Sequence, residues 1–424
     1  MEEAKSKVYG YRWVVLIVFM FLNAVLQMQW LIFAPIAKAA QSFYGTSTVG
    51  IDVFAMIYMG MLVIMFLPGV YIVNSYGVRI GVGIGAVLIG VFGLLKGVYG
   101  ANYTMACVSQ FGLAAAQPFI ICAITAVVAR WFPINERATA CGLASLSVYL
   151  GVLFVMVVTP LFLTENIVNG ITLYNIDHIL MIYGIISVAS AIVLLVFMRE
   201  KPPTPPGVYG QDENIVDFLK GLKLIFKQRD MIVLLLLSLL LLGVFNALST
   251  CIDQLCKLRG LTFDQTGLVG GVMLLGGIIG AIILPLFSDK YRKRKAFIVL
   301  AAILVIPGVA GLTFISGYGG LLISSCIFGF FCLGAGPIAF QYGAEITYPV
   351  PEASSNGLLL LVGQVSGILF VFCINWFGIF NSMILCVVLM PVAVLLAGIL
   401  KESSMIQSGV DATDTIQEGL TGIK

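Results

Sequence analysis

Twelve long apolar runs divide the sequence, and each is long enough to cross a lipid bilayer. They cover about residues 12–36, 51–73, 80–99, 103–129, 138–163, 179–198, 231–252, 268–287, 297–317, 321–347, 355–379 and 382–400. A membrane-spanning helix needs about 20 apolar residues. The chain is only 10% charged, whereas soluble domains carry about 25% charged residues. The sequence therefore predicts an all-α membrane protein with twelve transmembrane helices.

The basic residues predict how these helices are oriented. If both termini are cytoplasmic, all but four of the 23 Lys and Arg fall on the inner side of the membrane. The four exceptions are Lys38, Lys96, Lys257 and Arg259. Because cytoplasmic loops carry an excess of Lys and Arg, we expect a multi-pass protein with both termini in the cytoplasm. The plasma membrane is its expected location.

A long connection separates the first six runs from the last six. It begins with the helix-breaking stretch KPPTPPG at 201–207 and continues with apolar residues at helical spacing opposite several lysines. The predicted organisation is an N-terminal six-helix half (1–198), a cytoplasmic linker (199–230), a C-terminal six-helix half (231–400) and a disordered cytoplasmic tail (401–424). The linker helix either lies on the membrane surface or is soluble.

Equivalent short loops follow the second and the eighth runs. The first reads Asn74–Arg79, and the second reads Ser288–Lys295 with Asp289 where the first has Asn74. Both resemble the loop signature of the major facilitator superfamily, in which an acidic and a basic residue share a tight turn. The resemblance implies two six-helix halves that rock about a midplane site. Arg79, Asp289 and Lys290 are the expected residues of a cytoplasmic gate.

Polar side chains recur inside the apolar runs. In the first run Asn23, Gln27 and Trp30 share one helical face, because they are spaced by four and three residues. The other candidates are Gln110 and Gln117 on the fourth run, Tyr149 on the fifth, Asn246 on the seventh and Gln364 on the eleventh. A polar pathway between the halves would use these groups. Hydrogen bonds between helices would also explain the amides, and an interfacial position would explain Trp30.

The absence of certain residue types restricts the functions that the chain could have. The middle of each run lacks Asp, Glu, His, Lys and Arg, the nine cysteines lack a metal-type spacing, and the only histidine is His178. We therefore expect no metal, no cofactor, no catalysis and no nucleic-acid partner. The lack of charged residues in the middle of the runs favours a uniporter for a neutral or cationic solute, and Trp30 suits an organic cation. A monomer is the expected oligomeric state. Asp52, at an outer end, leaves ion coupling open.

The chain resembles the feline leukaemia virus subgroup C receptor-related family. The resemblance rests on stretches in most of the twelve runs, including Gln29-Trp30 and Ala116-Gln117, and is most specific in AEITYP at 344–349. Members of that family are associated with choline and ethanolamine uptake and with haem export. In the choline carriers a Trp and a Gln that match Trp30 and Gln364 line the site. Asn246 and Tyr149 stand where the family has Tyr and Gln.

These expectations combine into one reading of the chain. It is an alternating-access facilitator that moves a choline-like cation across a lipid bilayer and binds it against Trp30, Gln27, Gln117, Tyr149, Asn246 and Gln364. One alternative is a transporter of the same fold for haem or another metabolite. The other alternative is a membrane receptor or scaffold that transports nothing.

Overall fold

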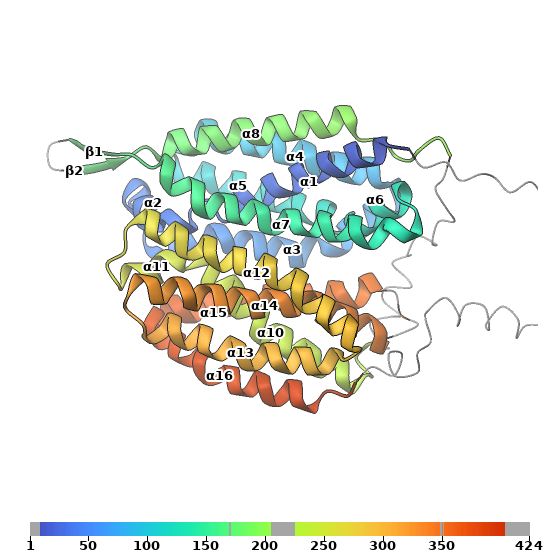
Figure 1. Cartoon of the computed structure of the whole chain (residues 1–424). Coiled ribbons are helices and arrows are strands. Elements are labelled where there is room, and N and C mark those ends of the chain that lie inside the picture. The colour runs from blue at the N-terminus through green and yellow to red at the C-terminus, as the bar shows by residue number, and fades with distance from the viewer. Residues whose placement is uncertain (1–8, 169–170, 205–224, 348–349, 351, 403–424) are drawn as a thin grey trace, which may run out of the picture.

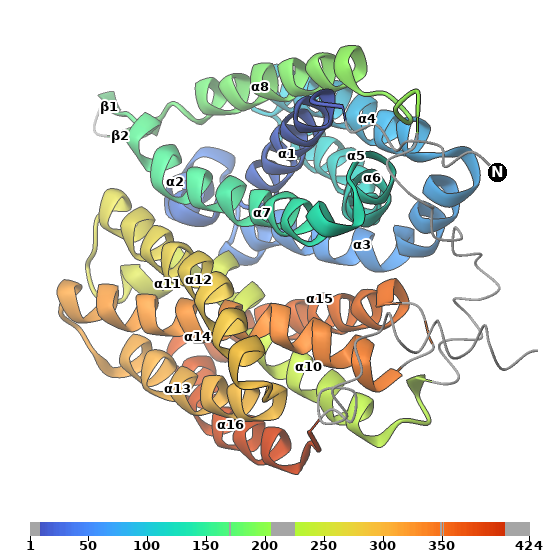
Figure 2. The ribbon, with the colours of Figure 1, turned by 45° about the vertical axis from the view of Figure 1, so that its right-hand side comes forward.

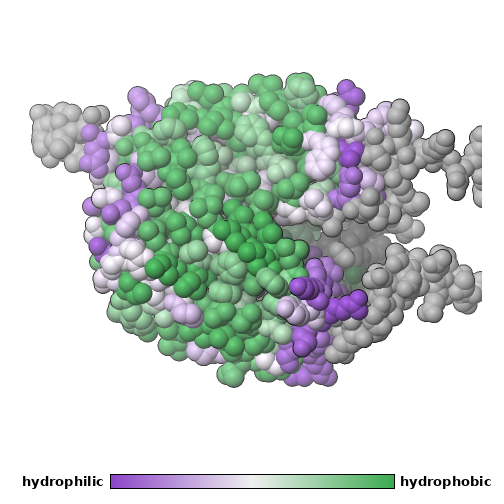
Figure 3. Space-filling view, viewed as in Figure 1, coloured by the Kyte–Doolittle hydropathy of each residue, from purple (hydrophilic) through white to green (hydrophobic). Residues whose placement is uncertain are grey.

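The predicted spans are present in the computed structural model, which describes residues 9–168, 171–204, 225–347, 350 and 352–402. Twelve helices in the described chain are long and apolar enough to cross a membrane. They form one bundle (Figure 1), and its surface has a broad apolar band with hydrophilic residues at both ends (Figure 3). The twelve-helix, all-α prediction is therefore confirmed.

The first six spans belong to one group of helices. They are α1 (Tyr11–Trp30), α3 (Thr48–Tyr76), α4 (Val78–Tyr99), α5 (Tyr103–Ile121), α7 (Ile134–Phe162) and α8 (Ile176–Phe197). The first span continues through a 3-10 turn, η1 (Ala34–Ile36), into α2 (Ala37–Tyr44). The short helix α6 (Ile124–Trp131) links α5 to α7. Gly77 has a φ of 94° between α3 and α4, a conformation that favours glycine.

The last six spans form the second group. They are α10 (Arg229–Thr250), α12 (Phe263–Tyr291), α13 (Arg294–Phe314), α14 (Tyr318–Thr347), α15 (Glu352–Phe377) and α16 (Ile379–Ile399). A short helix, α11 (Ile252–Lys257), follows α10. A capping box starts α12, in which Thr262 accepts a bond from the Gln265 backbone N–H and the Gln265 side chain accepts one from the Thr262 backbone N–H.

The two groups lie against each other along α3 with α15 and α7 with α12 (Figure 2). Helices α8 and α16 lie at opposite edges of the bundle (Figure 1). We call the two groups the first half and the second half. The hairpin end is the end that carries α2, α11 and the β-hairpin described next. The linker end is the opposite end, where α8 ends and α10 begins.

Two features differ from the sequence expectations. The fourth run, expected to be continuous over 103–129, is broken into α5 and α6. An antiparallel hairpin of β1 (Glu165–Val168) and β2 (Ile171–Tyr174), which the run pattern did not predict, lies between α7 and α8, with Glu165 opposite Tyr174. Most of the predicted linker helix and nearly all of the predicted tail lie outside the described residues.

Candidate functional site

The polar face of α1 is buried, and its last residue, Trp30, lies next to the second half. Trp30 is 7% exposed and donates its Nε1–H to the Ala55 carbonyl of α3, 3.3 Å away. Trp30 also lines a small cavity together with Asp52 of α3 and Thr250 of α10. The indole therefore does not lie at a lipid-facing boundary, and it contacts a space to which both halves contribute.

Several polar atoms near this face are buried without a hydrogen-bond partner in the described chain. They include Nε2 of Gln27, Oε1 of Gln117 and the hydroxyl of Tyr58. Gln27 is 1% exposed and Gln117 is 4% exposed. A buried polar group with no partner costs about 1–3 kcal/mol. Groups in this state can bind a solute or water, and the role of Gln27 and Gln117 as site residues stays a prediction.

The second half contributes Asn246 and Gln364. Asn246 is 6% exposed and donates from Nδ2 to the Gly363 carbonyl of α15, 3.2 Å away. The next turn of α15 carries Gly367, where an added Cβ would lie 2.8 Å from Cβ of Asn246 and 3.1 Å from Sδ of Met59 in the first half. Asn246 is thus at the contact between the halves, and its amide NH2 is engaged in helix packing.

The remaining predicted residues differ in how they are engaged. Gln364 and Tyr149 are half-buried, and Tyr149 lies close enough to the Cys332 thiol of the second half for an electrostatic interaction. Gln110, which shares a face with Gln117, does not have a free side chain. Its Nε2 donates to the carbonyls of Gln29 and Phe54, at 3.3 and 3.1 Å.

Gln110 instead belongs to a buried network around Lys96. The Nζ of Lys96 donates to Oε1 of Gln110 at 2.7 Å and to Oε1 of Gln29 at 3.2 Å, and it lies 5.2 Å from the centroid of the Phe33 ring. Lys96 is 1% exposed. Sequence reasoning placed Lys96 at the outer end of its run but did not anticipate complete burial, since a lysine near a helix end usually extends its amine to water.

Asp52 forms the centre of a polar cluster that bridges the halves at the hairpin end. Its Oδ2 accepts from Nε2 of Gln254 at 2.8 Å and from Nδ2 of Asn375 at 2.7 Å. The Cys251 thiol, 3.7 Å away, donates to the same oxygen. Asp52 belongs to the first half and all three donors belong to the second. Spacing along the chain does not show that these four residues meet.

A second carboxylate, Asp253 of α11, also bridges the halves. Its Oδ2 accepts from the backbone N–H of Lys38, 2.9 Å away in the first turn of α2. Burial raises the pKa of Asp253 from 3.8 to about 6, against the opposing effects of the Lys38 bond and of the Lys257 and Lys38 charges. The Tyr174 and Phe263 rings, with centroids 6.1 Å apart, add an apolar contact between the halves at this end.

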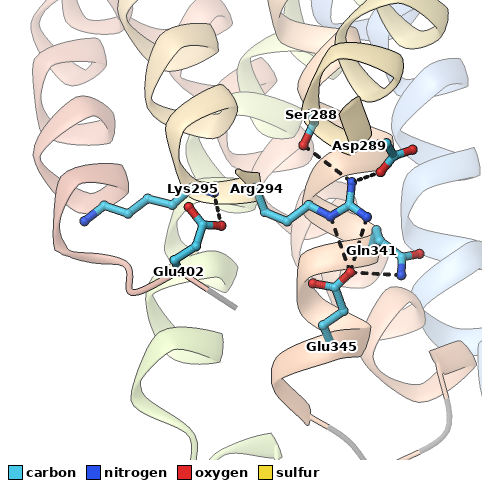
Figure 4. Close-up of polar contacts among 7 residues, drawn as sticks. All are labelled: Ser288, Asp289, Arg294, Lys295, Gln341, Glu345 and Glu402. Carbon is cyan, nitrogen blue, oxygen red and sulfur yellow. Dashed lines mark hydrogen bonds and ion pairs between the residues drawn. The ribbon is translucent and has the colours of Figure 1, made fainter. Parts of the chain in front are cut away.

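The loop signature of the second half forms a compact ionic cluster at the linker end (Figure 4). Arg294 pairs with Asp289 and with Glu345, whose Oε1 lies 3.3 Å from the Arg294 Nε. Gln341 donates to the same Glu345 oxygen at 3.1 Å. The predicted gate residue Asp289 is therefore bonded to Arg294 and not to its neighbour Lys290, which is exposed.

The first half has a related arrangement around Glu200. This side chain accepts from the backbone N–H groups of Val78 and Arg79, at 3.2 and 2.6 Å, and pairs with Arg130. In the second half Glu402 accepts from the backbone N–H of Lys295 at 3.1 Å. Each half thus has a glutamate after its last span that caps the N-terminus of its third span. Glu200 follows α8 and caps α4, and Glu402 follows α16 and caps α13. The side chain of Arg79 is exposed.

The two ends of the bundle are therefore held differently. The Asp52 and Asp253 bonds at the hairpin end cross from one half to the other, whereas the Arg294, Glu200 and Glu402 contacts at the linker end each stay within one half. Figure 3 shows a recess between the halves at the linker end. Among the described residues, hydrogen bonds join the halves at the hairpin end, and the recess separates the halves at the linker end.

Comparisons with known proteins agree with this architecture. The chain is similar to the choline/ethanolamine transporter FLVCR2 of Rattus norvegicus, with 28% identity over 98% of this chain and 80% of that protein. It is also similar to the uncharacterized MFS-type transporter C09D4.1 of Caenorhabditis elegans, with 27% identity over 95% of this chain and 71% of that protein. The first of these relatives confirms the resemblance predicted from the sequence.

A solved structure has the same fold. The crystal structure of a D-xylose-proton symporter superposes with a TM-score of 0.74 at 14% identity, over 93% of this chain and 99% of that one. The sequence profile of the Major Facilitator Superfamily matches residues 16–371. This profile covers most of the chain and includes both halves. The chain is a transporter that belongs to the Major Facilitator Superfamily.

Proposed function

We propose that this transporter moves a choline-like organic cation by alternating access, as a uniporter. The cation binds between the halves against Trp30, Gln27, Gln117, Tyr149, Asn246 and Gln364. The similarity to a choline/ethanolamine transporter supports this class of solute. Gln27 and Gln117 each have a polar atom that lacks a partner among the described residues, and this supports a solute site between the halves.

The observation that carries the proposal is the position of Trp30. Its ring is buried, is fixed by the bond to the Ala55 carbonyl, and lines a cavity shared by the two halves. An aromatic face in such a place attracts a quaternary ammonium group, and the attraction reaches about 2 kcal/mol when the groups are desolvated. Because the indole is already held in place, little conformational entropy is lost when the cation binds.

The proposed orientation places the linker end in the cytoplasm of a cell whose plasma membrane holds the protein. All but four of the 23 Lys and Arg then face the cytoplasm. In this orientation the described state is open to the cytoplasm and closed to the outside. Transport requires the Asp52 and Asp253 bonds to break while the linker end closes. Arg79 lies in the first turn of α4, and Asp289 and Lys290 lie in the last turn of α12, so these residues would form the gate there.

Choline binding to the purified protein tests the proposal. Binding to the folded state raises its melting temperature by mass action. We expect choline to stabilise the wild type and Trp30→Ala to bind about 30-fold more weakly, which corresponds to a loss of about 2 kcal/mol. Trp376→Ala is the matched control, because Trp376 is 86% exposed on the bundle surface. Equal weakening by both substitutions would contradict the role of Trp30.

Haem is the alternative cargo to include in the same assay. His178, the single histidine, lies at the hairpin end in the first turn of α8 with an exposed imidazole. It therefore cannot ligate haem iron beside Trp30. Stabilisation by haem but not by choline or ethanolamine would overturn the proposal of an organic cation and favour the alternative cargo.

A further inference from the structure

The carboxylate of Asp52 is buried without a cationic partner in the described chain. It is 2% exposed, and its hydrogen-bond donors are the neutral groups of Gln254, Asn375 and Cys251. A buried carboxylate is normally paired with a cation, because neutral donors compensate only part of the lost hydration. The site therefore has an acidic group whose natural counterpart is a positive charge.

The two oxygens of this carboxylate have different surroundings. All three donors reach Oδ2, and within the described residues no hydrogen bond reaches Oδ1. Asp52 also lines the small cavity that contains Trp30, Phe33 and Phe54. The centroids of the two phenylalanine rings are 4.8 Å apart. A carboxylate oxygen and aromatic rings together can bind an ammonium group, through charge attraction and cation–π interactions.

The hydrogen bonds to Asp52 depend on how the two halves are arranged, because the donors belong to the opposite half. In the described state the cavity has room for roughly one water molecule, so a larger cation does not fit. The donors Gln254 and Asn375 belong to the second half, whereas Asp52 and the three rings belong to the first half. When the halves separate at the hairpin end, Asp52 loses these donors and remains on the same wall as the rings.

We propose that Asp52 and the rings of Trp30, Phe33 and Phe54 form an entry subsite for an organic ammonium ion at the hairpin end. This inference rests on the proposed transport of an organic cation. The cation takes the place of Gln254 and Asn375 as the partner of Asp52, so capture and closure compete for one carboxylate. Once the cation moves past Trp30 toward Gln27, the amides return to Asp52 and the hairpin end closes behind it.

Phe33 contributes less than the other two rings. The Lys96 amine already lies 5.2 Å from its centroid, so part of its cation-attracting surface is in use within the first half. Trp30 and Phe54 are therefore the rings expected to contact the ammonium group. Replacing Phe33 by Leu should change cation affinity less than replacing Phe54 by Leu.

Two substitutions distinguish binding of the cation by Asp52 from a role of Asp52 only in opening and closing the hairpin end. Asp52 and Asp253 are both buried carboxylates at the hairpin end, and both bridge the halves, but only Asp52 lines the aromatic cavity. Asp52→Asn and Asp253→Asn each remove one negative charge and retain an oxygen that accepts hydrogen bonds. Uptake from the hairpin side is measured in cells for choline, with its uncharged carbon analogue 3,3-dimethyl-1-butanol as a competitor.

We expect Asp52→Asn to raise the KM for choline at least tenfold more than it raises the inhibition constant of the neutral analogue. Asp253→Asn should shift both values together, because it alters only the balance between conformations. Asp52→Glu keeps the charge and should preserve the preference for choline, which gives a test if Asp52→Asn does not fold. Equal effects of the two asparagine variants on both compounds would overturn the subsite.

A binding measurement distinguishes failure of this inference from failure of the proposed function. Thermal shifts of the purified wild type are recorded with choline, ethanolamine and tetramethylammonium. If none of them stabilises the wild type, the proposed cation transport is refuted and the entry subsite with it. If choline is taken up and binds, but Asp52→Asn and Asp52→Glu have the same KM as the wild type, only the entry subsite is refuted.

Discussion

Replacing Asn375 by Ala should loosen the closed hairpin end by an amount that can be worked from its contacts. Asn375 donates to Oδ2 of Asp52 at 2.7 Å, and a hydrogen bond to a charged group contributes about 1.5–3 kcal/mol net of water. The bond exists only while the halves are together. Its loss should therefore raise the population of the open state about 10- to 150-fold, since 1.4 kcal/mol is a factor of ten.

The Cys251 thiol gives a direct measure of this opening. It is 1% exposed in the described state and lies in the same cluster, 3.7 Å from Asp52. A membrane-impermeant maleimide reaches it only when the hairpin end opens, so the labelling rate reports the open population. Mass spectrometry of peptides assigns the label to this cysteine. We expect Asn375→Ala to accelerate its labelling about 10- to 150-fold.

The matched control for this measurement is Asn381→Ala. Asn381 and Asn375 both donate from Nδ2 to the backbone carbonyl four residues earlier, at 3.0 Å in each case, but only Asn375 reaches Asp52. Labelling of Cys251 should be unchanged in the control. If Asn375→Ala labels at the wild-type rate in a folded protein, the Asp52 cluster does not hold the hairpin end closed.

Three further perturbations have defined outcomes. Burial raises the pKa of Asp253 to about 6, so the contribution of this group to stability is complete below pH 3.8 and is lost as the pH rises through 6. The melting temperature should therefore fall more between pH 4.5 and 7.5 in the wild type than in Asp253→Asn. An equal fall in the two proteins would show that Asp253 does not cause the pH dependence. Glu200→Ala removes a cap with two backbone donors and should lower the free energy of unfolding by about 0.5–2 kcal/mol; chemical denaturation should show a smaller loss for Glu402→Ala, which removes one such bond. Phe263→Ala breaks the ring contact with Tyr174 and should speed Cys251 labelling severalfold, as expected for an aromatic pair of about 0.5–1.5 kcal/mol; an unchanged rate would show that the hairpin does not help closure.

The twelve spans and the burial of the α1 face could be read from the sequence because both depend on local pattern. An apolar stretch of bilayer length predicts a span without knowledge of its neighbours, and helical spacing placed Gln27 and Trp30 on one face. The β-hairpin also has a local signal in the sequence. Asn-Gly at 169–170 stands between short alternating segments, which is a strong hairpin pattern.

The Asp52 cluster could not be predicted in the same way. Asp52 and Asn375 are 323 positions apart, and their meeting depends on how α3 packs against α15. The different roles of Gln110 and Gln117 depend on packing as well, since the two share a helical face but only Gln110 lies beside the buried Lys96. Sequence spacing identifies polar side chains that face the bundle, whereas tertiary packing decides which of them are already bonded.

The distribution of charge along the bundle also determines how transport would respond to voltage. Within the twelve described spans, every Asp, Glu, Lys and Arg lies in the first or last two turns of its helix. Rocking of the halves about the midplane therefore carries little protein charge across the membrane. The electrical work of a cycle is then that of the solute alone, about 2.3 kcal/mol per 100 mV for a monovalent cation. A cell with a negative interior would concentrate such a cation about 50-fold for each 100 mV, with no coupled ion.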